Sequence, residues 1–404
     1  MRHALGSCIL KTEVPMFQYF SGNYLWSLSV LRALASGANF GELDWACKGL
    51  QQAAAIEPAG DIDAWHSALM RVASQVEGFG ADWAQRGRVV SARDAYLRAS
   101  IYYQWAEALL DPDDARAPAS FGSHLSTFAR AAALMEPAVE ILDIPFEDTT
   151  LTAYFVPAAG AAGKAPVVIL SDGLDGTKEE LFYIARALSE RGIACLAYDG
   201  PGQGATLRLR KLVARHDSEA AAAAVCDYLE TRGDIDTQRI GMIGVSLGGY
   251  YAPRAAAFEK RIKACVAWSA IYDYHAAWLR RTGYSPEHGV RGAGRGAARG
   301  TTNKHFLKIM GVNDWDAAFS KLEDFRLKGV ASRISCDILL VQGERDMQTP
   351  VAEVQSLFDE IGSTNKELRI YRDDEGGAAH VQLDRQEPAL SEICDWLAEH
   401  LERL

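Results

Sequence analysis

The stretch Ile240-Gly241-Met242-Ile243-Gly244-Val245-Ser246-Leu247-Gly248-Gly249-Tyr250 carries the most specific pattern in the chain. An apolar, β-branched run leads into Gly244-x-Ser246-x-Gly248, and an alanine-rich helical stretch follows. This order is typical of a nucleophile elbow, in which a serine sits on a strained turn between a strand and a helix. Glycines on both sides let so tight a turn close without side-chain collisions. We therefore predict that Ser246 is a nucleophile, provided that a base and an acid follow it.

His380 is the predicted base. A serine hydroxyl attacks efficiently only when a histidine takes its proton, and a carboxylate must orient and stabilise that imidazole. His380 lies in a loop directly after the last predicted strand, 367–371. His400 is the other histidine that follows a plausible acid, but it lies inside the final amphipathic helix and is expected at the surface.

Asp346 is the predicted acid, because the chain order Ser, acid, His is the one that this kind of elbow requires. It follows the predicted strand 338–342 through a short turn, so its carboxylate leaves the C-terminal edge of the sheet beside the histidine loop. Glu344 in the same turn is the nearest alternative. Asp337 precedes the strand and would lie at the opposite edge.

Backbone donors for the oxyanion are expected at two places. One is the N–H of Leu247, directly after the nucleophile. The other is in the loop after the strand that ends at Leu170, where Leu174 is the first choice and Gly173 the second.

Two acids, Asp172 and Asp175, flank this loop, where negative charge would oppose an oxyanion. Asp175 has two interpretations that the residues leave open. It could cap the helix that is predicted to start near Lys178, or it could face the pocket and exchange a proton or a hydrogen bond with the substrate.

The chain changes its pattern near residue 137. From about Phe17 to Met135 apolar residues recur at helical spacing, and the aromatic cluster of residues 17–26 is interpreted as a packed helix face, with a pocket lining as the alternative. Residues 139–146 and 151–156 then predict a hairpin, after which strands and helices alternate, which indicates a parallel sheet covered on both faces. The Arg- and Gly-rich run 289–300 is interpreted as a solvated loop, with an anionic partner as the alternative.

Length, charge and cysteine content limit the number of domains and the classes of partner. The chain has 404 residues, enough for two or three domains, and its net charge of -11 argues against nucleic acid, whose phosphates need a concentrated positive face. No apolar run approaches the roughly 18 residues that span a bilayer, and residues 1–16 do not resemble a secretory signal. Seven scattered cysteines show no metal-ligand spacing. We therefore expect a cytoplasmic protein without disulfides, metal, cofactor or membrane contact.

Three motifs together resemble one family of hydrolases. They are Asp172-Gly173-Leu174-Asp175-Gly176-Thr177-Lys178-Glu179-Glu180, Asp199-Gly200-Pro201-Gly202-Gln203-Gly204 and Gly244-Val245-Ser246-Leu247-Gly248-Gly249. From about Trp83 to the C-terminus the chain resembles the 2,6-dihydroxypseudooxynicotine hydrolase group. That group belongs with the fungal polyketide chain-shortening hydrolases of the yellowish-green pigment type and, more distantly, with FrsA-like esterases.

The resemblance implies an α/β-hydrolase core under a helical cap, a triad of Ser246, Asp346 and His380, and a homodimer. It also places a functional acid at Asp175, where the nicotine-pathway enzyme has a glutamate. The better-known members hydrolyse a C–C bond beside a ketone in an aromatic or polyketide-like small molecule.

We therefore predict an α/β-hydrolase fold with a mostly parallel, eight-stranded sheet and helices on both faces. The predicted cap spans residues 1–136 and the catalytic domain 137–404, with 270–332 as an insert that contributes to the lid. The predicted activity is C–C hydrolysis beside a ketone, of the 1,3-dicarbonyl or acyl-phenol type. The alternatives are an ester, lactone or amide hydrolase with the same triad, and a non-catalytic binding protein on this fold.

Overall fold

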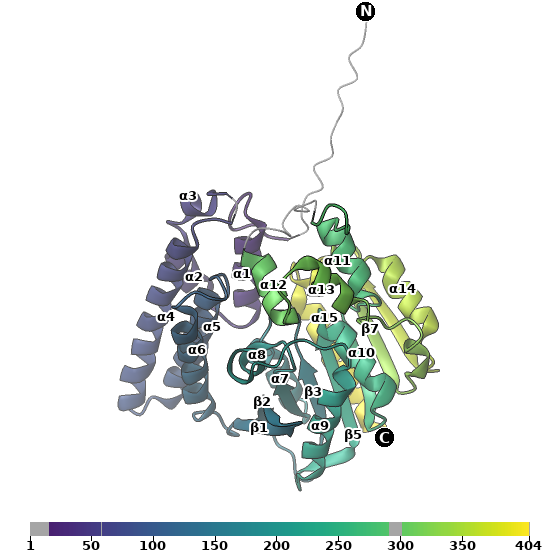
Figure 1. Cartoon of the computed structure of the whole chain (residues 1–404). Helices are drawn as coiled ribbons and strands as arrows, with labels where there is room; N and C mark the ends of the chain where they lie inside the picture. The colour runs from purple at the N-terminus through teal and green to yellow at the C-terminus, as the bar shows by residue number, and fades with distance from the viewer. Residues whose placement is uncertain (1–15, 58, 291–300, 404) are drawn as a thin grey trace, which may run out of the picture.

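The computed structural model describes residues 16–57, 59–290 and 301–403 (Figure 1). Within these ranges, no helix has both the length and the apolar composition that crossing a membrane requires. From residue 291 onward, the Arg- and Gly-rich run lies outside the described residues, so neither interpretation of it is tested.

Among the described residues between 16 and 139 the regular structure is helical, as the apolar spacing predicts. In the described ranges the helices are α1 (Tyr24–Ala35), α2 (Phe40–Cys47), α3 (Gln51–Ala54), α4 (Ile62–Gln85), α5 (Val89–Glu107) and α6 (Ala117–Ala132). Side-chain caps fix where three of them begin: Asn23 accepts from the Trp26 N–H at 3.1 Å, Asn39 from the Glu42 N–H at 3.2 Å and Asp61 from the Ala64 N–H at 3.0 Å. We call α1–α6 the N-terminal helical region.

This region has a core of its own, made largely of aromatic residues. Trp26 and Trp65 lie with ring centroids 4.9 Å apart, and Phe20 packs edge-on against both. All three are buried, and full burial of one such side chain stabilises the fold by roughly 1.5–3 kcal/mol. The core interpretation of the 17–26 cluster therefore holds for Phe20 and Trp26, whereas Phe17 is exposed.

One eight-stranded sheet follows, as predicted. Its strands are β1 (Glu140–Phe146), β2 (Thr149–Val156), β3 (Ala165–Ser171), β4 (Ala194–Tyr198), β5 (Ile235–Val245), β6 (Ile262–Trp268), β7 (Asp337–Gly343) and β8 (Lys366–Tyr371). The order across the sheet is β1-β2-β4-β3-β5-β6-β7-β8. β1 and β2 form the predicted hairpin, β2 pairs antiparallel with β4, and every pair from β4 to β8 is parallel.

Helices cover both faces of the sheet (Figure 1). One face packs against α9 (Ser218–Glu230), α10 (Gly248–Phe258) and α14 (Val351–Glu360). The other packs against α7 (Phe182–Ser189) and α15 (Gln386–Glu402), and Phe128 and Ala132 of α6 join that core. The division into a cap and a catalytic domain at residue 137 stays a prediction, and the first strand begins three residues later.

Further helices lie in the catalytic part of the described chain. They are α8 (Gly204–Arg210), α11 (Tyr274–Thr282), α12 (Thr301–Met310) and α13 (Trp315–Leu322). The helix that is predicted to start near Lys178 begins at Phe182 instead, and Lys178 and Glu179 before it are part of a buried ionic network with Asp199.

The prediction that His400 lies at the surface is wrong. Its ring is buried, stacks on Trp396 with centroids 3.9 Å apart, and places Nδ1 2.8 Å from the Trp396 carbonyl oxygen. α15 turns this side toward the sheet, as the neighbouring buried Leu397 and Leu401 show.

Candidate active site

Ser246 lies on the turn between β5 and α10. Its backbone is left-handed, with φ at 57°, and its N–H donates to the Trp268 carbonyl oxygen at 2.8 Å. A Cβ on Gly244 would lie 1.8 Å from the Gly248 carbonyl oxygen, and one on Gly248 would lie 2.5 Å from the Ser171 carbonyl oxygen. The flanking glycines are therefore required by close backbone approach, as the elbow pattern predicts.

The structure brings Ser246, His380 and Asp346 into one hydrogen-bonded chain. His380 Nε2 lies 2.8 Å from Ser246 Oγ, and His380 Nδ1 lies 2.7 Å from Asp346 Oδ2. Within this geometry the imidazole can take the serine proton while the carboxylate holds its other nitrogen.

Asp346 is buried and fixed by several donors. Its Oδ1 accepts from the N–H groups of Gln348 at 2.7 Å and Thr349 at 3.1 Å, and its Oδ2 accepts from Gln342 Nε2 at 3.0 Å. Burial would raise the pKa of Asp346, but His380 and the backbone donors outweigh it and lower the pKa below its ordinary value. The carboxylate is therefore ionised at neutral pH.

The two other acids that were considered lie elsewhere. Glu344 accepts from the Asp373 N–H at 3.0 Å, away from His380. Asp337 lies at the start of β7, with its Oδ2 3.8 Å from His400 Nε2.

Asp384 organises the histidine loop. Its carboxylate accepts three consecutive backbone N–H groups, from Gly377 at 2.7 Å, Ala378 at 3.1 Å and Ala379 at 3.0 Å. On the other side of His380, the Val381 N–H donates to Ser269 Oγ at 2.9 Å. The base is thus held from both sides although it lies in a loop.

The loop after β3 comes close to the nucleophile. A Cβ on Gly173 would lie 3.3 Å from Ser246 Oγ. The Gly173 N–H donates to Asp172 Oδ1 at 2.6 Å, so it is already engaged. Among the described residues, neither the Leu174 nor the Leu247 N–H has a hydrogen-bond acceptor. Of the two loop donors considered, Leu174 is therefore the one available to an oxyanion.

Asp175 faces the N-terminal helical region. Its carboxylate pairs with Arg32 of α1 at 3.1 Å, and 58% of the side chain is accessible. Burial would raise the pKa of Asp175, but the charge of Arg32, with a smaller contribution from His305, lowers it below its ordinary value. The capping interpretation is wrong, because α7 begins seven residues later, at Phe182, and has no side-chain cap.

Arg32 also binds a second carboxylate, that of Glu180, at 2.9 Å. Glu180 in turn accepts from Gln104 Nε2 of α5 at 2.5 Å. Burial and, next, the charge of Glu180 raise the pKa of Asp172 well above its ordinary value, which favours its neutral form. The negative charge expected around the oxyanion loop is thus reduced at Asp172 and compensated at Asp175.

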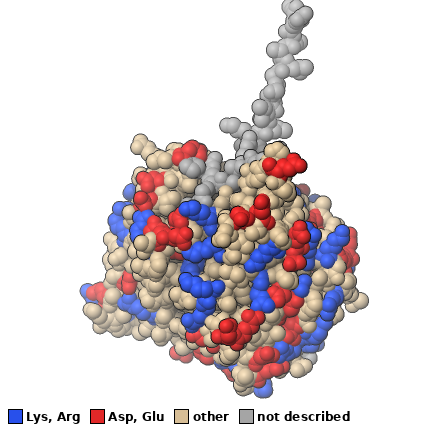
Figure 2. Space-filling model, viewed as in Figure 1, with Lys and Arg blue, Asp and Glu red and all other residues tan. Residues whose placement is uncertain are grey.

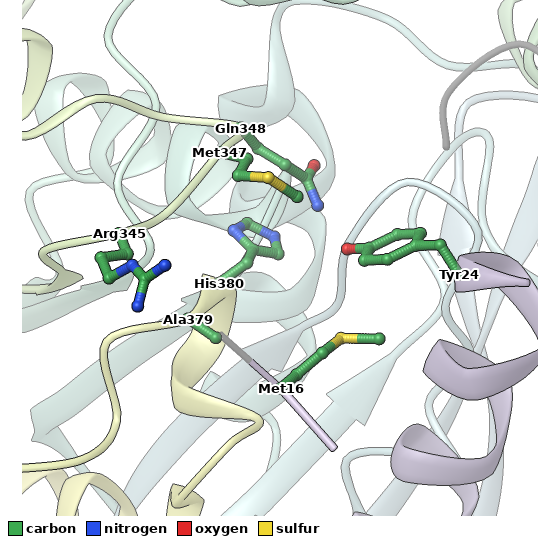
Figure 3. Close-up of a pocket in the computed structure, with 7 residues that line it drawn as sticks. All are labelled: Met16, Tyr24, Arg345, Met347, Gln348, Ala379 and His380. Carbon is green, nitrogen blue, oxygen red and sulfur yellow. The ribbon is translucent and has the colours of Figure 1, made fainter. Parts of the chain in front are cut away.

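A small pocket opens beside His380. Tyr24, at the start of α1, points its hydroxyl toward the His380 ring, and Met347 and Gln348 line the same pocket (Figure 3). The pocket interpretation of the aromatic cluster therefore holds for Tyr24. A wider hollow, lined by Arg98, Phe182 and Tyr183 among others, contains none of the three hydrogen-bonded site residues.

Comparisons with known proteins all find hydrolases. Residues 182–403 match the model of the prolyl oligopeptidase family, and residues 80–277 match the FrsA-like esterase model. "Hydrolase acrC" of Aspergillus aculeatus is 29% identical, over 96% of this chain and 99% of the relative. "20-hydroxy-prefusarin hydrolase FUS2" of Gibberella moniliformis is 29% identical, over 84% of this chain and 88% of the relative.

A solved structure shows the same fold. The 2,6-dihydroxy-pseudo-oxynicotine hydrolase superimposes with a TM-score of 0.76 at 24% identity, covering 92% of this chain and 95% of that one. The match includes the helical region and the sheet together, because it extends over nearly the whole chain.

Proposed function

Because the chain belongs to the prolyl oligopeptidase family of α/β hydrolases, we propose that it is a serine hydrolase that cleaves a C–C bond beside a ketone. The observation that carries the proposal is the hydrogen-bonded chain from Ser246 through His380 to Asp346, with the ionised Asp175 in the loop after β3, which comes close to Ser246. The proposed substrate is a small aromatic or polyketide-like molecule of the 1,3-dicarbonyl or acyl-phenol type.

In the proposed mechanism, Ser246 Oγ attacks the ketone carbon while His380 takes the hydroxyl proton. The N–H groups of Leu247 and Leu174 receive the oxyanion. The intermediate collapses with cleavage of the C–C bond, and the electron pair leaves as an enolate or phenolate carbanion. Protonated His380 returns its proton to that carbon. Water, activated by the same imidazole, then releases the acyl group from Ser246.

Asp175 has a separate proposed task. An ionised carboxylate is an acceptor, so Asp175 would accept a hydrogen bond or the proton from the phenol or enol hydroxyl of the substrate. Arg32 supports this task, because it binds the carboxylate and keeps it ionised. The N-terminal helical region would thereby contribute directly to the chemistry as a cap.

The experiment that tests the proposal is an assay of purified protein against acyl-phenols, 1,3-diketones and matched aryl esters. We expect cleavage products of the C–C bond, and complete loss of turnover in Ser246→Ala. Efficient turnover of the esters with no C–C cleavage would reject the proposal in favour of the second candidate. Unchanged activity of Ser246→Ala would reject the nucleophile.

The second candidate is a carboxylic ester, lactone or amide hydrolase with the same site residues. The observation that favours it is the FrsA-like esterase match over residues 80–277, which covers the oxyanion loop and the elbow. The two candidates share the attack of Ser246 and differ in the leaving group, which is an oxygen or a nitrogen in the second.

We further propose a cytoplasmic location and a homodimer. The cysteines of the described residues, Cys47, Cys195, Cys226, Cys265, Cys336 and Cys394, are all unpaired, which supports a reducing compartment. Large exposed apolar side chains such as Phe40, Trp45 and Phe79 lie on the N-terminal helical region and favour association. Light scattering on the purified protein tests the dimer.

A further inference from the structure

Tyr24 is the residue through which the N-terminal helical region reaches the pocket of His380. It is the first residue of α1, and its hydroxyl points toward the His380 ring (Figure 3). Asn23 fixes this end of the helix, because its Oδ1 accepts from the Trp26 N–H at 3.1 Å while its Nδ2 donates to the Ala54 carbonyl oxygen at 2.9 Å. Asn23 is buried, so the position of Tyr24 follows from the packing of the helical region.

A second polar group, the carboxamide of Gln348, lies beside the same space (Figure 3). In the described structure Gln348 forms its hydrogen bonds through the main chain, since its N–H donates to Asp346 at 2.7 Å and its carbonyl oxygen accepts from Arg280 at 3.4 Å. Among the described residues the Tyr24 hydroxyl also has no hydrogen-bond partner. Both side chains are therefore available to a molecule in the pocket.

The pocket has the size of a single water molecule. Its volume is about 20 Å³, and a bound water needs about 10–15 Å³ or more and a few polar partners. The hydroxyl of Tyr24, the carboxamide of Gln348 and the imidazole of His380 provide these partners. They come from three separate parts of the chain, which are α1, the turn after β7 and the histidine loop. The described fold thus gathers them at one point.

Release of an acyl group from Ser246 needs a water that His380 can deprotonate. Such a water must lie within hydrogen-bond distance of the imidazole and direct one lone pair at the acyl carbon. Burial raises the pKa of Tyr24, so its hydroxyl stays protonated at neutral pH and can donate. A water that accepts from Tyr24 and donates to His380 and to Gln348 Oε1 has its second lone pair left for the carbon.

We propose that Tyr24 and Gln348 hold the hydrolytic water beside His380. The inference rests on the acyl-enzyme of the proposed function and adds the residues that position the nucleophile of its second step. The water oxygen bonds to the acyl carbon as the imidazole takes its proton. The bond from that carbon to Ser246 Oγ then breaks, and the imidazole returns the proton to Oγ. The N-terminal helical region, through α1, thereby takes part in release of the acyl group.

The lifetime of the acyl-enzyme tests this role. The purified protein is mixed with 4-nitrophenyl butyrate, whose activated leaving group makes acylation fast, and the butyryl adduct on Ser246 is followed by rapid quenching and intact mass. We expect Tyr24→Phe to lengthen the lifetime of the adduct by about tenfold or more, and to lower kcat and KM together. The value of kcat/KM should change little, because it reports formation of the acyl-enzyme only. A residue that only supports the fold would lower kcat/KM as well.

Two further variants and a second nucleophile sharpen the test. Gln348→Leu should lengthen the lifetime in the same way as Tyr24→Phe. Tyr19→Phe, whose wild-type hydroxyl donates to Asp44 at 2.7 Å, is the matched control and should leave the lifetime unchanged. Hydroxylamine, a stronger nucleophile than water, should restore most of the turnover of Tyr24→Phe, because it attacks the acyl carbon without a positioned water.

Failure of this inference is distinguishable from failure of the proposed function. The ester assay reports the role of Tyr24 even if the protein cleaves no C–C bond. Absence of both the adduct and 4-nitrophenol release in the wild type would reject the serine chemistry itself. An equal adduct lifetime in the wild type and in Tyr24→Phe overturns the role of Tyr24 alone. A fall in kcat/KM with an unchanged lifetime overturns it as well, because Tyr24 would then act in the first step.

Discussion

At the scale of single residues, Asp172 and Asp175, the two acids that flank the oxyanion loop, differ in the direction of their pKa shifts. Asp175 keeps an accessible carboxylate opposite Arg32, which lowers its pKa. Asp172 is buried, accepts one N–H from Gly173, and has a second oxygen, Oδ2, without a hydrogen-bond donor in the described structure. The same residue type is thus ionised at one position and driven toward its neutral form at the other.

Asp172→Asn tests this difference through stability. In the unfolded chain Asp172 titrates near 3.8, and in the folded protein burial and Glu180 raise its pKa well above that value. The contribution of protonated Asp172 to folding stability is therefore complete below its pKa in the unfolded chain. It is lost as the pH rises through its pKa in the folded protein. We expect the Tm of Asp172→Asn to exceed that of the wild type by a margin that widens from pH 5 to pH 8. The exposed Asp227→Asn is the control, and a margin that shrinks with rising pH would contradict the assignment.

Asp175→Asn tests the proposed acceptor. Loss of a general base typically costs about a hundredfold in kcat, and we expect that loss with an acyl-phenol but not with a 4-nitrophenyl ester that lacks a hydroxyl. Because Arg32 lowers the pKa of Asp175, the wild-type contribution is present at neutral pH and is lost only as the pH falls through that lowered value. The measurement is kcat against pH for both substrates. An equal loss on both would point to a positional role only.

Sequence alone could predict Ser246, Asp346 and His380, because each lies in the turn or loop that follows a strand, and parallel strands bring such residues to one edge. It missed Arg32, Gln203 and Asp384. Arg32 lies 143 positions before its partner Asp175, on a helix whose docking no local pattern specifies. Asp384 had a local signal, since it stands four positions after His380 and a run of small residues, 376–379, precedes both.

At the scale of elements, the loop 199–204 supports the oxyanion loop. Gln203 Nε2 donates to the carbonyl oxygens of Asp172 and Gly173, at 2.5 Å and 2.8 Å, while its Oε1 accepts from the Gly200 N–H at 3.0 Å. The glycine-rich loop thus holds the oxyanion loop in place. Strands could be placed from their apolar runs, whereas α8, which begins inside this loop, could not, because it is short and lacks a side-chain cap.

Gln203→Leu should leave the three hydrogen-bonded site residues in place but release the loop that carries Leu174. A misplacement of about 1 Å in a catalytic group costs on the order of a hundredfold in rate. We therefore expect kcat for a 4-nitrophenyl ester to fall by about tenfold to a hundredfold, with a smaller change in KM. Gln355→Leu, on the exposed side of α14, is the control. An unchanged kcat would show that the loop holds its position without Gln203.

At the scale of the whole molecule, charged contacts join the N-terminal helical region to the rest. Arg32 binds Glu180, His124 Nε2 lies 3.3 Å from Glu179, and Arg208 binds Glu107. On the outside, acidic and basic side chains alternate over the face shown in Figure 2. The sequence alone could not predict which charged pairs join the N-terminal helical region to the rest of the protein. Charges of both signs occur throughout the sequence, and only tertiary packing selects among them.

The Arg208–Glu107 contact provides the clearest test of this junction. Both guanidinium contacts are 2.9 Å long, and the Glu107 side chain is only 7% accessible. Arg208→Met would leave that carboxylate buried and unpaired, which should lower the free energy of unfolding by about 3 kcal/mol. Glu107→Leu combined with Arg208→Met should restore most of it, since no buried charge remains.

Urea unfolding of the four proteins measures the coupling. Glu147→Gln, which removes one of the two carboxylate partners of Arg215 at the surface, should cost less than about 1 kcal/mol. Losses that simply add in the double variant would mean that the two side chains are not coupled across this junction.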